Sequence, residues 1–203
     1  MKHNNTLAAI TSFSEPRTLF GKPVQQSFIS FGVYEQAIGA APRPLRWICE
    51  LGTGNGITTL FLALHAFYQD IPFVTFDKHA LYGQQTRRLL KACHARVIHE
   101  DCFSARGREL FAALVPSAPG LLFCDNGDKR KEIRTFIPMI GPHSIVVVHD
   151  WGNEIGESDI PWDKVVAFNP WHEDSIALGT HAAILRVMGL REQRDCQRKE
   201  KGN

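Results

Sequence analysis

The sequence predicts an open α/β sheet with helices on both faces, and three observations favour this fold class. A glycine-rich segment, 52–56, lies between an apolar run, 45–51, and a stretch at helical spacing, which is typical of a strand, a tight turn and a helix. Further apolar runs alternate with helical segments up to residue 150. Most of these runs end in an acidic residue, at the sheet edge where ligands bind.

Length and composition fit one globular domain. The chain has 203 residues, 44% hydrophobic and 22% charged, and its net charge of +2 is too small by itself to indicate nucleic acid or an anionic membrane. Its five cysteines form no Cys-x-x-Cys pair, so a reducing cytoplasm is the expected setting. The N-terminus leads into no long apolar stretch, so neither a signal peptide nor a membrane span is expected.

We expect three parts along the chain. Residues 1–43 form an N-terminal arm with a short helix, 28–38. Pro42 and Pro44 end this helix. We expect this arm to serve as a lid on the acceptor side, the side from which a substrate enters. Residues 44–190 form the sheet domain, and residues 191–203, almost wholly charged or polar, form a disordered tail.

The central part alternates strands and helices. We expect strands at 45–51, 71–77, 96–99, 121–125 and 144–150, and helices at 56–68, 80–93, 104–115 and 129–140. Ser104 is the expected N-cap of the third helix, and Leu81 is expected on the inner side of the second. The apolar run 144–150 predicts a strand buried on both faces. Two more strands, 165–168 and 182–187, follow, joined by a long turn.

The glycine turn organises the rest of the chain. Gly52, Gly54 and Gly56 allow a tight turn and leave room for a ligand that a Cβ atom would exclude. The helix after them offers unpaired N–H groups. The dinucleotide pattern Gly-x-Gly-x-x-Gly is not met, because Ile57 stands at its last glycine position.

The segment Glu50-Leu51-Gly52-Thr53-Gly54-Asn55-Gly56 resembles the first motif of class I S-adenosylmethionine (SAM)-dependent methyltransferases. The resemblance implies a Rossmann-like fold with a seven-stranded, mostly parallel sheet whose last strand is antiparallel. It also implies SAM as cofactor, bound by Glu50, Gly52, Thr53, Gly54 and Gly56. SAM carries no phosphate, and its positive methionine end favours a nearby acid such as Glu50.

Two further acids are expected beside the cofactor. Asp77 ends the second strand, where a carboxylate can accept hydrogen bonds from both ribose hydroxyls, and the resemblance implies this role. An acid that caps the next helix is the alternative. Asp101 and Cys102 stand where the family binds adenine, although many such loops begin with a capping aspartate.

Asp125 and Asp150 end neighbouring strands, so their carboxylates are expected to lie close together and to need a cation or a proton. Lys129 starts a helix and is expected to point outward. We therefore predict a divalent ion, Mg²⁺ or Mn²⁺, held by Asp125 and Asp150 with His149 or Asn126 as a lesser ligand. In the alternative, Asp125 pairs with the SAM amino group and no metal takes part.

A longer pattern is similar to one subgroup of the family, the cephalosporin-hydroxylase-like and sugar O-methyltransferase-like proteins. The similarity covers roughly residues 20–190 and lies in Gly21-Lys22-Pro23, Tyr34-Glu35, Glu50 to Gly54, Asp125 to Ile133, and Val148-His149-Asp150. Members of the subgroup commonly have Asp-x-x-His after strand four, with the histidine as base, and two adjacent acids after strand five. Here Asp128 replaces that histidine and His149 replaces the first acid.

Three residues are candidates for the catalytic base: His149, Lys129 and Asp128. A histidine near its ordinary pKa suits proton removal from a hydroxyl at neutral pH. Trp151 and Trp171 are candidates for an acceptor wall, although plain packing is the better expectation for both. His172 is a further candidate for contact with the acceptor.

These observations predict a SAM-dependent methyltransferase that acts on an oxygen of a small molecule or sugar, mainly through proximity. A SAM-binding protein without catalysis is the first alternative, and the two departures from the subgroup favour it. A nicotinamide-dependent oxidoreductase is the second, disfavoured by the glycine spacing. The expected partner is a small-molecule acceptor, with a homo-oligomer left open. Nucleic acid is not expected, because no Asn-Pro-Pro-Tyr or Pro-Cys motif and no dense basic-aromatic patch is recognised.

Overall fold

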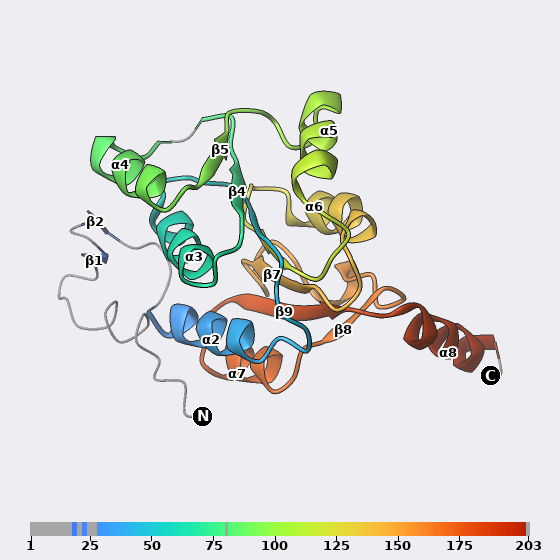
Figure 1. Cartoon of the computed structure of the whole chain (residues 1–203). Coiled ribbons are helices and arrows are strands. Elements are labelled where there is room, and N and C mark those ends of the chain that lie inside the picture. Colours follow the sequence, from blue (N-terminus) through green and yellow to red (C-terminus); the bar gives the residue numbers. More distant parts are fainter. Residues whose placement is uncertain (1–17, 20–21, 24–27, 80, 202–203) are drawn as a thin grey trace.

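Seven strands form one mixed sheet in this computed structural model, which describes residues 18–19, 22–23, 28–79 and 81–201 (Figure 1). The strands are β3 (Ile48–Leu51), β4 (Phe73–Phe76), β5 (Arg96–Ile98), β6 (Leu121–Cys124), β7 (Ile145–His149), β8 (Val165–Ala167) and β9 (Ala182–Val187). Their order is β5-β4-β3-β6-β7-β9-β8, and β9 runs antiparallel to both of its neighbours. The predicted seven-stranded sheet with an antiparallel last strand is therefore confirmed.

Helices cover both faces of the sheet. They are α2 (Phe28–Gly39), α3 (Ile57–Tyr68), α4 (Gln84–Ala92), α5 (Ala105–Leu114), α6 (Lys129–Phe136), α7 (Trp171–Ala177) and α8 (Leu190–Lys201), with short 3-10 helices at Ile137–Met139 and Glu157–Asp159. A separate two-stranded pair joins β1 (Thr18–Leu19) to β2 (Lys22–Pro23). None of the helices in the described part of the chain has the length and apolar character needed to cross a bilayer.

The core consists of two apolar layers, one on each face of the sheet. Side chains of α2, α3, α4 and α7 pack on one face, and those of α5 and α6 pack on the other. Figure 1 shows these two groups of helices on opposite sides of the sheet. The layers alternate along each strand: Val147 belongs to the first, whereas Val146 and Val148 belong to the second. This is the alternation that a strand buried on both faces requires. It confirms the strand expected at 144–150.

The elements before residue 128 lie close to where the sequence places them. Ser104 is the N-cap of α5, since its Oγ accepts a hydrogen bond of 2.8 Å from the Gly107 N–H. Cys49 and Cys124, which stand in apolar strands, are fully buried free thiols. Leu81 is the exception, because α4 begins only at Gln84 and the Leu81 side chain is 81% exposed.

Three elements after residue 128 differ from the sequence-based expectation. The helix expected at 129–140 becomes a 3-10 turn after Phe136, because Pro138 cannot continue an α-helix. The segment between β8 and β9 contains the helix α7 instead of only a turn. The expected disordered tail is helical to Lys201.

The start of α8 is fixed by contacts that composition alone does not reveal. Glu192 pairs with the Arg186 guanidinium of β9 at 2.8 Å and accepts the Gly189 N–H. Of the expected N-terminal arm, residues 1–17, 20–21 and 24–27 lie outside the described residues, and Gly21 of the subgroup pattern is among them.

Candidate functional site

A cavity of about 450 Å³ lies at the carboxyl edge of the sheet, where the glycine turn meets the ends of β6 and β7. Its lining consists of Gly52, Thr53, Gly54, Asn55, Ile57, Thr58, Asp125, His149 and Asp150. The lining therefore combines the glycine turn, the N-terminus of α3 and three titratable side chains. This is the edge at which ligands bind in open α/β sheets.

The glycines of the turn serve different needs. Gly52 has a φ of 96°, and a Cβ atom there would collide with the backbone carbonyl of Asp125, so the fold itself requires a glycine. Gly54 has a φ of 48°, but a Cβ atom there would meet no atom within 4 Å. Gly56 packs against Tyr82 and Thr86 and does not line the cavity. Gly54 thus leaves space open on the ligand side of the turn.

Asp77 holds the glycine turn in place. Its Oδ2 accepts hydrogen bonds from the Thr53 N–H (3.0 Å) and the Gly54 N–H (2.9 Å), and its Oδ1 accepts the His79 N–H. The carboxylate is therefore more than a cap for the next helix, because it fixes two amides that border the cavity. Its predicted role with a ribose stays a prediction.

Glu50 lies beneath the turn and not in the cavity lining. It is 1% exposed, and its Oε2 accepts the Thr75 hydroxyl at 2.7 Å. Burial raises its pKa to about 8, although hydrogen bonds from Thr59 and Thr75 act in the opposite direction. The structure does not bring this predicted cofactor ligand to the cavity surface.

Glu50 makes stability depend on pH. Between about pH 4.5 and pH 8 the folded chain keeps a proton that the unfolded chain has released, so the free energy of unfolding should fall as pH rises. Glu50→Gln keeps a side-chain oxygen for Thr75 and removes the titration. It should be more stable than the native chain at pH 8, by about 1 kcal/mol or more, with the gap closing toward pH 5. Urea unfolding across this range tests the prediction, which parallel curves for the two proteins would contradict.

Asp101 and Cys102 are turned away from the cavity. The Asp101 carboxylate pairs with Lys78 at 2.8 Å and accepts the Phe103 N–H, and these two contacts hold its pKa below the ordinary value. Cys102 is fully buried and its Sγ receives the side-chain amide of Asn126 at 3.2 Å. Neither lines the cavity, and Asn126, a suggested metal ligand, points toward Cys102.

Lys129 points inward, contrary to expectation. Its side chain is 4% exposed, and its Nζ lies 2.7 Å from Asp150 Oδ2, 3.0 Å from Glu154 Oε2 and 3.5 Å from Asp125 Oδ1. Burial favours the neutral amine, but these three carboxylates outweigh it and raise the pKa of Lys129. The ammonium is therefore charged and offsets part of the negative charge of the strand-end acids, which leaves the cluster with an excess of carboxylates but supplies a cation that the sequence-based prediction of a metal did not place there.

The predicted metal ligands do come together: Asp125, His149 and Asp150 each offer one atom, and these atoms lie within 4.8 Å of one another. A divalent ion at this place would have to displace the Lys129 ammonium from Asp150 and Asp125. Two cations so close in a half-buried site repel strongly. The residues therefore do not fit a metal ion while Lys129 keeps its position.

His149 lies at the centre of the cluster. Its Nδ1 is 3.3 Å from Asp125 Oδ1 and 3.2 Å from Asp150 Oδ1. Burial alone lowers the pKa of His149, but the carboxylates of Asp125 and Asp150 outweigh burial and raise it. The imidazole is thus held in the cavity wall with its protonation set by its two neighbours.

The third candidate base, Asp128, and two candidates for acceptor contact, His172 and Trp171, have other contacts. Asp128 is exposed and caps α6, where its Oδ1 accepts the Lys131 N–H at 3.0 Å. His172 is buried, its Nδ1 accepts the Ile184 N–H, and its ring packs edge-on to Trp151. Trp171 packs against the core. All three have structural contacts that explain their positions.

Sequence reasoning missed two acids near the site. Glu154 completes the set of carboxylates around Lys129, from an irregular segment without a motif. Glu132 is fully buried, accepts the Asn126 N–H at 3.0 Å, and has a pKa raised by burial to about 8. The spacing of Asp125 and Lys129, four residues apart across a helix start, is the signal in the sequence that points to this cluster.

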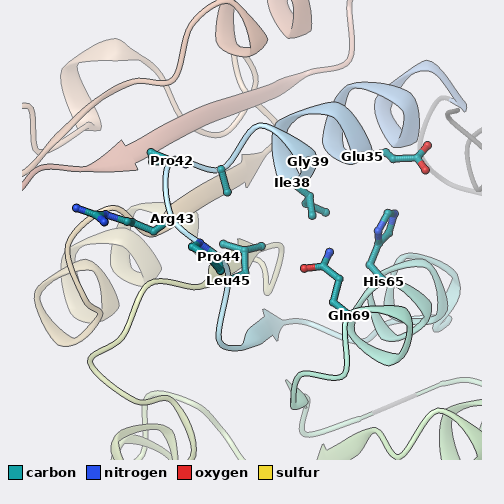
Figure 2. Close-up of a pocket in the computed structure, with 10 residues that line it drawn as sticks. Glu35, Ile38, Gly39, Pro42, Arg43, Pro44, Leu45, His65 and Gln69 are labelled. Atoms are coloured by element: carbon teal, nitrogen blue, oxygen red, sulfur yellow. The ribbon is translucent and has the colours of Figure 1, made fainter. Parts of the chain in front are cut away.

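A second hollow, of about 480 Å³, lies between the ends of α2 and α3 and the segment that enters β3. Figure 2 shows that His65 of α3 and Gln69, the C-cap residue of that helix, face Ile38 of α2, whereas the Arg43 guanidinium points away. His65 is buried, and burial lowers its pKa to about 4. This hollow is at the opposite end of α3 from the glycine turn and shares no residue with the candidate site.

Comparison with known proteins identifies structures with a similar fold. No family model and no curated protein sequence matches the chain. A mutant of MtNAS aligns with a TM-score of 0.51 at 12% identity, over 91% of this chain and 69% of that one. The rRNA methyltransferase aviRa from Streptomyces viridochromogenes aligns with a TM-score of 0.50 at 13% identity, over 92% and 94%.

Cofactor-bound Rv0187 from MTB gives a TM-score of 0.46 at 17% identity, over 71% of this chain, which spans 62% of that protein's resolved length. Likeness at such low identity establishes the fold alone. The chain has the Rossmann-like methyltransferase fold that the sequence predicts, and its resemblance to class I methyltransferases is confirmed at that level.

Proposed function

We propose, from this fold and this site, that the chain is a SAM-dependent methyltransferase that acts on an oxygen of a small molecule or sugar. The observation that carries the proposal is the cavity itself: a glycine turn faces two carboxylates. Among the described residues that line it there is no lysine or arginine. A dinucleotide would bring its phosphates to a negative wall, whereas a cofactor with a sulfonium and an ammonium group is attracted to it.

The residues fit such a cofactor. Asp77, which does not itself line the cavity, would accept a ribose hydroxyl beside the turn whose two amides it already holds. Gly54 leaves the space that a side chain would fill. Asp125 would face the ammonium end, since it lines the cavity at the end of β6. When bound, SAM supplies an electrophilic methyl group.

His149 is our candidate for the base, because it is the titratable nitrogen in the cavity lining. Asp125 and Asp150 stabilise the imidazolium that forms when it takes a proton from an acceptor hydroxyl. Lys129 in turn keeps those carboxylates from repelling each other. The proposed reaction therefore needs no metal ion.

A SAM-binding protein without catalysis is the alternative. Asp128 caps α6 and leaves the place of the family's histidine without a base, which favours this alternative. Incubation with SAM and a panel of hydroxyl acceptors separates the two functions, because only the enzyme yields S-adenosylhomocysteine.

The binding half of the proposal is tested by calorimetric titration with SAM and with NAD. SAM should bind and NAD should not. Asp77→Ala should lose on the order of 2–4 kcal/mol of SAM affinity, because the turn loses its anchor and the ribose its acceptor. Asp77→Asn keeps one side-chain oxygen, so its affinity for SAM should lie between those of the native chain and of Asp77→Ala. SAM affinity unchanged in a folded Asp77→Ala variant would mean that neither the anchored turn nor a ribose contact of Asp77 contributes to SAM binding.

A further inference from the structure

The hollow between α4 and the edge strand β5 carries positive charge that the candidate site does not use. This hollow measures about 450 Å³ and is lined by Tyr82, Arg87, Leu90, Lys91, His94, Ala95, Val97 and His99. In Figure 1 the helix and the strand lie side by side at the end of the sheet. We call these two elements and the hollow the α4–β5 surface.

The charge of this surface is one-sided. From residue 78 to residue 99 the sequence has five lysines and arginines, three histidines and no aspartate or glutamate. Lys78 is neutralised by Asp101. The other four, Arg87, Arg88, Lys91 and Arg96, are exposed, and among the described residues none of them forms an ion pair. Exposed cations on one helix and the neighbouring strand, without acids among them, attract anions to this surface.

Aromatic rings border the same surface. Phe67 and Tyr68, at the end of α3, are 48% and 72% exposed. The Phe67 ring stacks on His94, with centroids 6.2 Å apart and an angle of 28° between the rings. Since His94 lines the hollow, these rings continue the basic surface. Exposed rings beside a row of cations offer stacking surfaces for bases next to contacts for phosphates.

We infer that the α4–β5 surface binds single-stranded nucleic acid. The cations would neutralise successive phosphates, and the exposed rings would stack with bases. A bilayer surface is a poorer partner, because a flat surface cannot enter the hollow that Arg87, Lys91 and His94 line. An acidic protein segment would satisfy the charge but would leave the rings without partners.

The surface begins beside the glycine turn. The Leu81 N–H donates to the Gly54 carbonyl at 3.0 Å, and Tyr82 packs against Gly56 and also lines the hollow. A strand bound there would thus run toward the rim of the candidate cofactor site. The inference itself does not depend on methyl transfer, because it concerns binding alone.

The test is a fluorescence anisotropy titration of the full chain with a labelled single-stranded RNA of about 12 nucleotides. Binding should weaken with salt, with a logarithmic slope of about −2 to −3 if three or four phosphates are neutralised. Arg87→Gln with Lys91→Gln should weaken binding at least about tenfold and make the slope shallower by about 1.4, which is two phosphate contacts. Phe67→Ala with Tyr68→Ala should weaken binding with an unchanged slope.

Matched control variants test whether binding depends on the α4–β5 surface or on charge in general. Arg194→Gln with Arg198→Gln removes the same charge from the exposed side of α8 and should leave binding within about twofold. Because Arg87 also lies over the Tyr82 ring, Lys91→Gln with Arg96→Gln provides a second pair that leaves this contact intact. Equal losses in the α8 control, or no RNA binding while phosphatidylserine vesicles or a polyglutamate peptide bind, would overturn the inference.

Discussion

Lys129→Met should lower the free energy of unfolding by about 2–4 kcal/mol and, in the same variant, create a divalent metal site. The native ammonium is the shared partner of Asp125, Asp150 and Glu154. Without it, these carboxylates repel one another next to a half-buried histidine. Removing one partner of a fully buried pair costs about 3–5 kcal/mol, and these acids are partly exposed, which places the expected loss somewhat lower. Urea unfolding in excess chelator measures it.

The expected metal site distinguishes the Lys129→Met variant from the native chain more clearly than the loss of stability does. In Lys129→Met the three ligand atoms of Asp125, His149 and Asp150 no longer compete with a fixed positive charge, and oxygen and nitrogen donors of this kind suit Mn²⁺. Calorimetry with Mn²⁺ should show saturable binding to the variant and none to the native chain, and the ion should restore part of the lost stability.

Lys131→Met is the matched control for this variant. Lys131 stands on the same helix but is exposed and lies over the Phe103 ring, so its loss should cost less than about 1 kcal/mol and create no metal site. Stoichiometric Mn²⁺ binding to the native chain would mean that the ion displaces the lysine. The metal predicted from the sequence would then be correct.

Much of the fold was predictable because patterns of different kinds agree. The apolar run before Gly52, the glycines and the helical spacing after them specify a strand, a turn and a helix independently. The continuous apolar run of β7 specifies a strand in the middle of the sheet. By contrast, α8 consists of polar residues, and only its tertiary contacts through Glu192 reveal where it begins.

The sequence predicted that several acids stand at or near strand ends, but not what each of them contacts. Glu50, Asp77, Asp101, Asp125 and Asp150 all stand at or near strand ends, yet their surroundings differ completely. One is buried beneath the turn, one anchors the turn, one pairs with Lys78, and two flank His149. These differences depend on neighbours that are distant in sequence, such as Thr75 for Glu50, so a local motif cannot distinguish them.

The direction of the Lys129 side chain decides what this residue contacts. A charged residue at the start of a helix usually lies in solvent, which is why it was expected to point outward. Side chains of a helix tilt toward its N-terminus, however, and α6 begins at the carboxyl edge of the sheet. The tilt therefore directs Lys129 at the strand-end acids. The basic residues of α4 and β5 were likewise not recognised as one surface from the sequence. They form it only because the helix and the strand lie side by side in the fold.

Gly54→Val should abolish SAM binding while the chain remains folded. A Cβ atom at Gly54 would meet no protein atom within 4 Å, so the added side chain would extend into the cavity without a clash in the ligand-free chain. The remaining cost to folding is the positive φ of 48°, which a residue with a Cβ atom adopts at an expense of about 1–2 kcal/mol. The dissociation constant for SAM should rise at least about 100-fold, equivalent to about 2.7 kcal/mol.

Gly179→Val separates the loss of space from the backbone strain. Gly179 also has a positive φ, 64°, and open space at its Cβ position, but it lies in the turn between α7 and β9 and does not line the cavity. Both variants should lose similar stability in urea unfolding, whereas only Gly54→Val should lose SAM in calorimetry. If a folded Gly54→Val variant binds SAM as the native chain does, the cofactor does not pass the glycine turn. The proposed function would then lose its structural basis, even if RNA still bound to the α4–β5 surface.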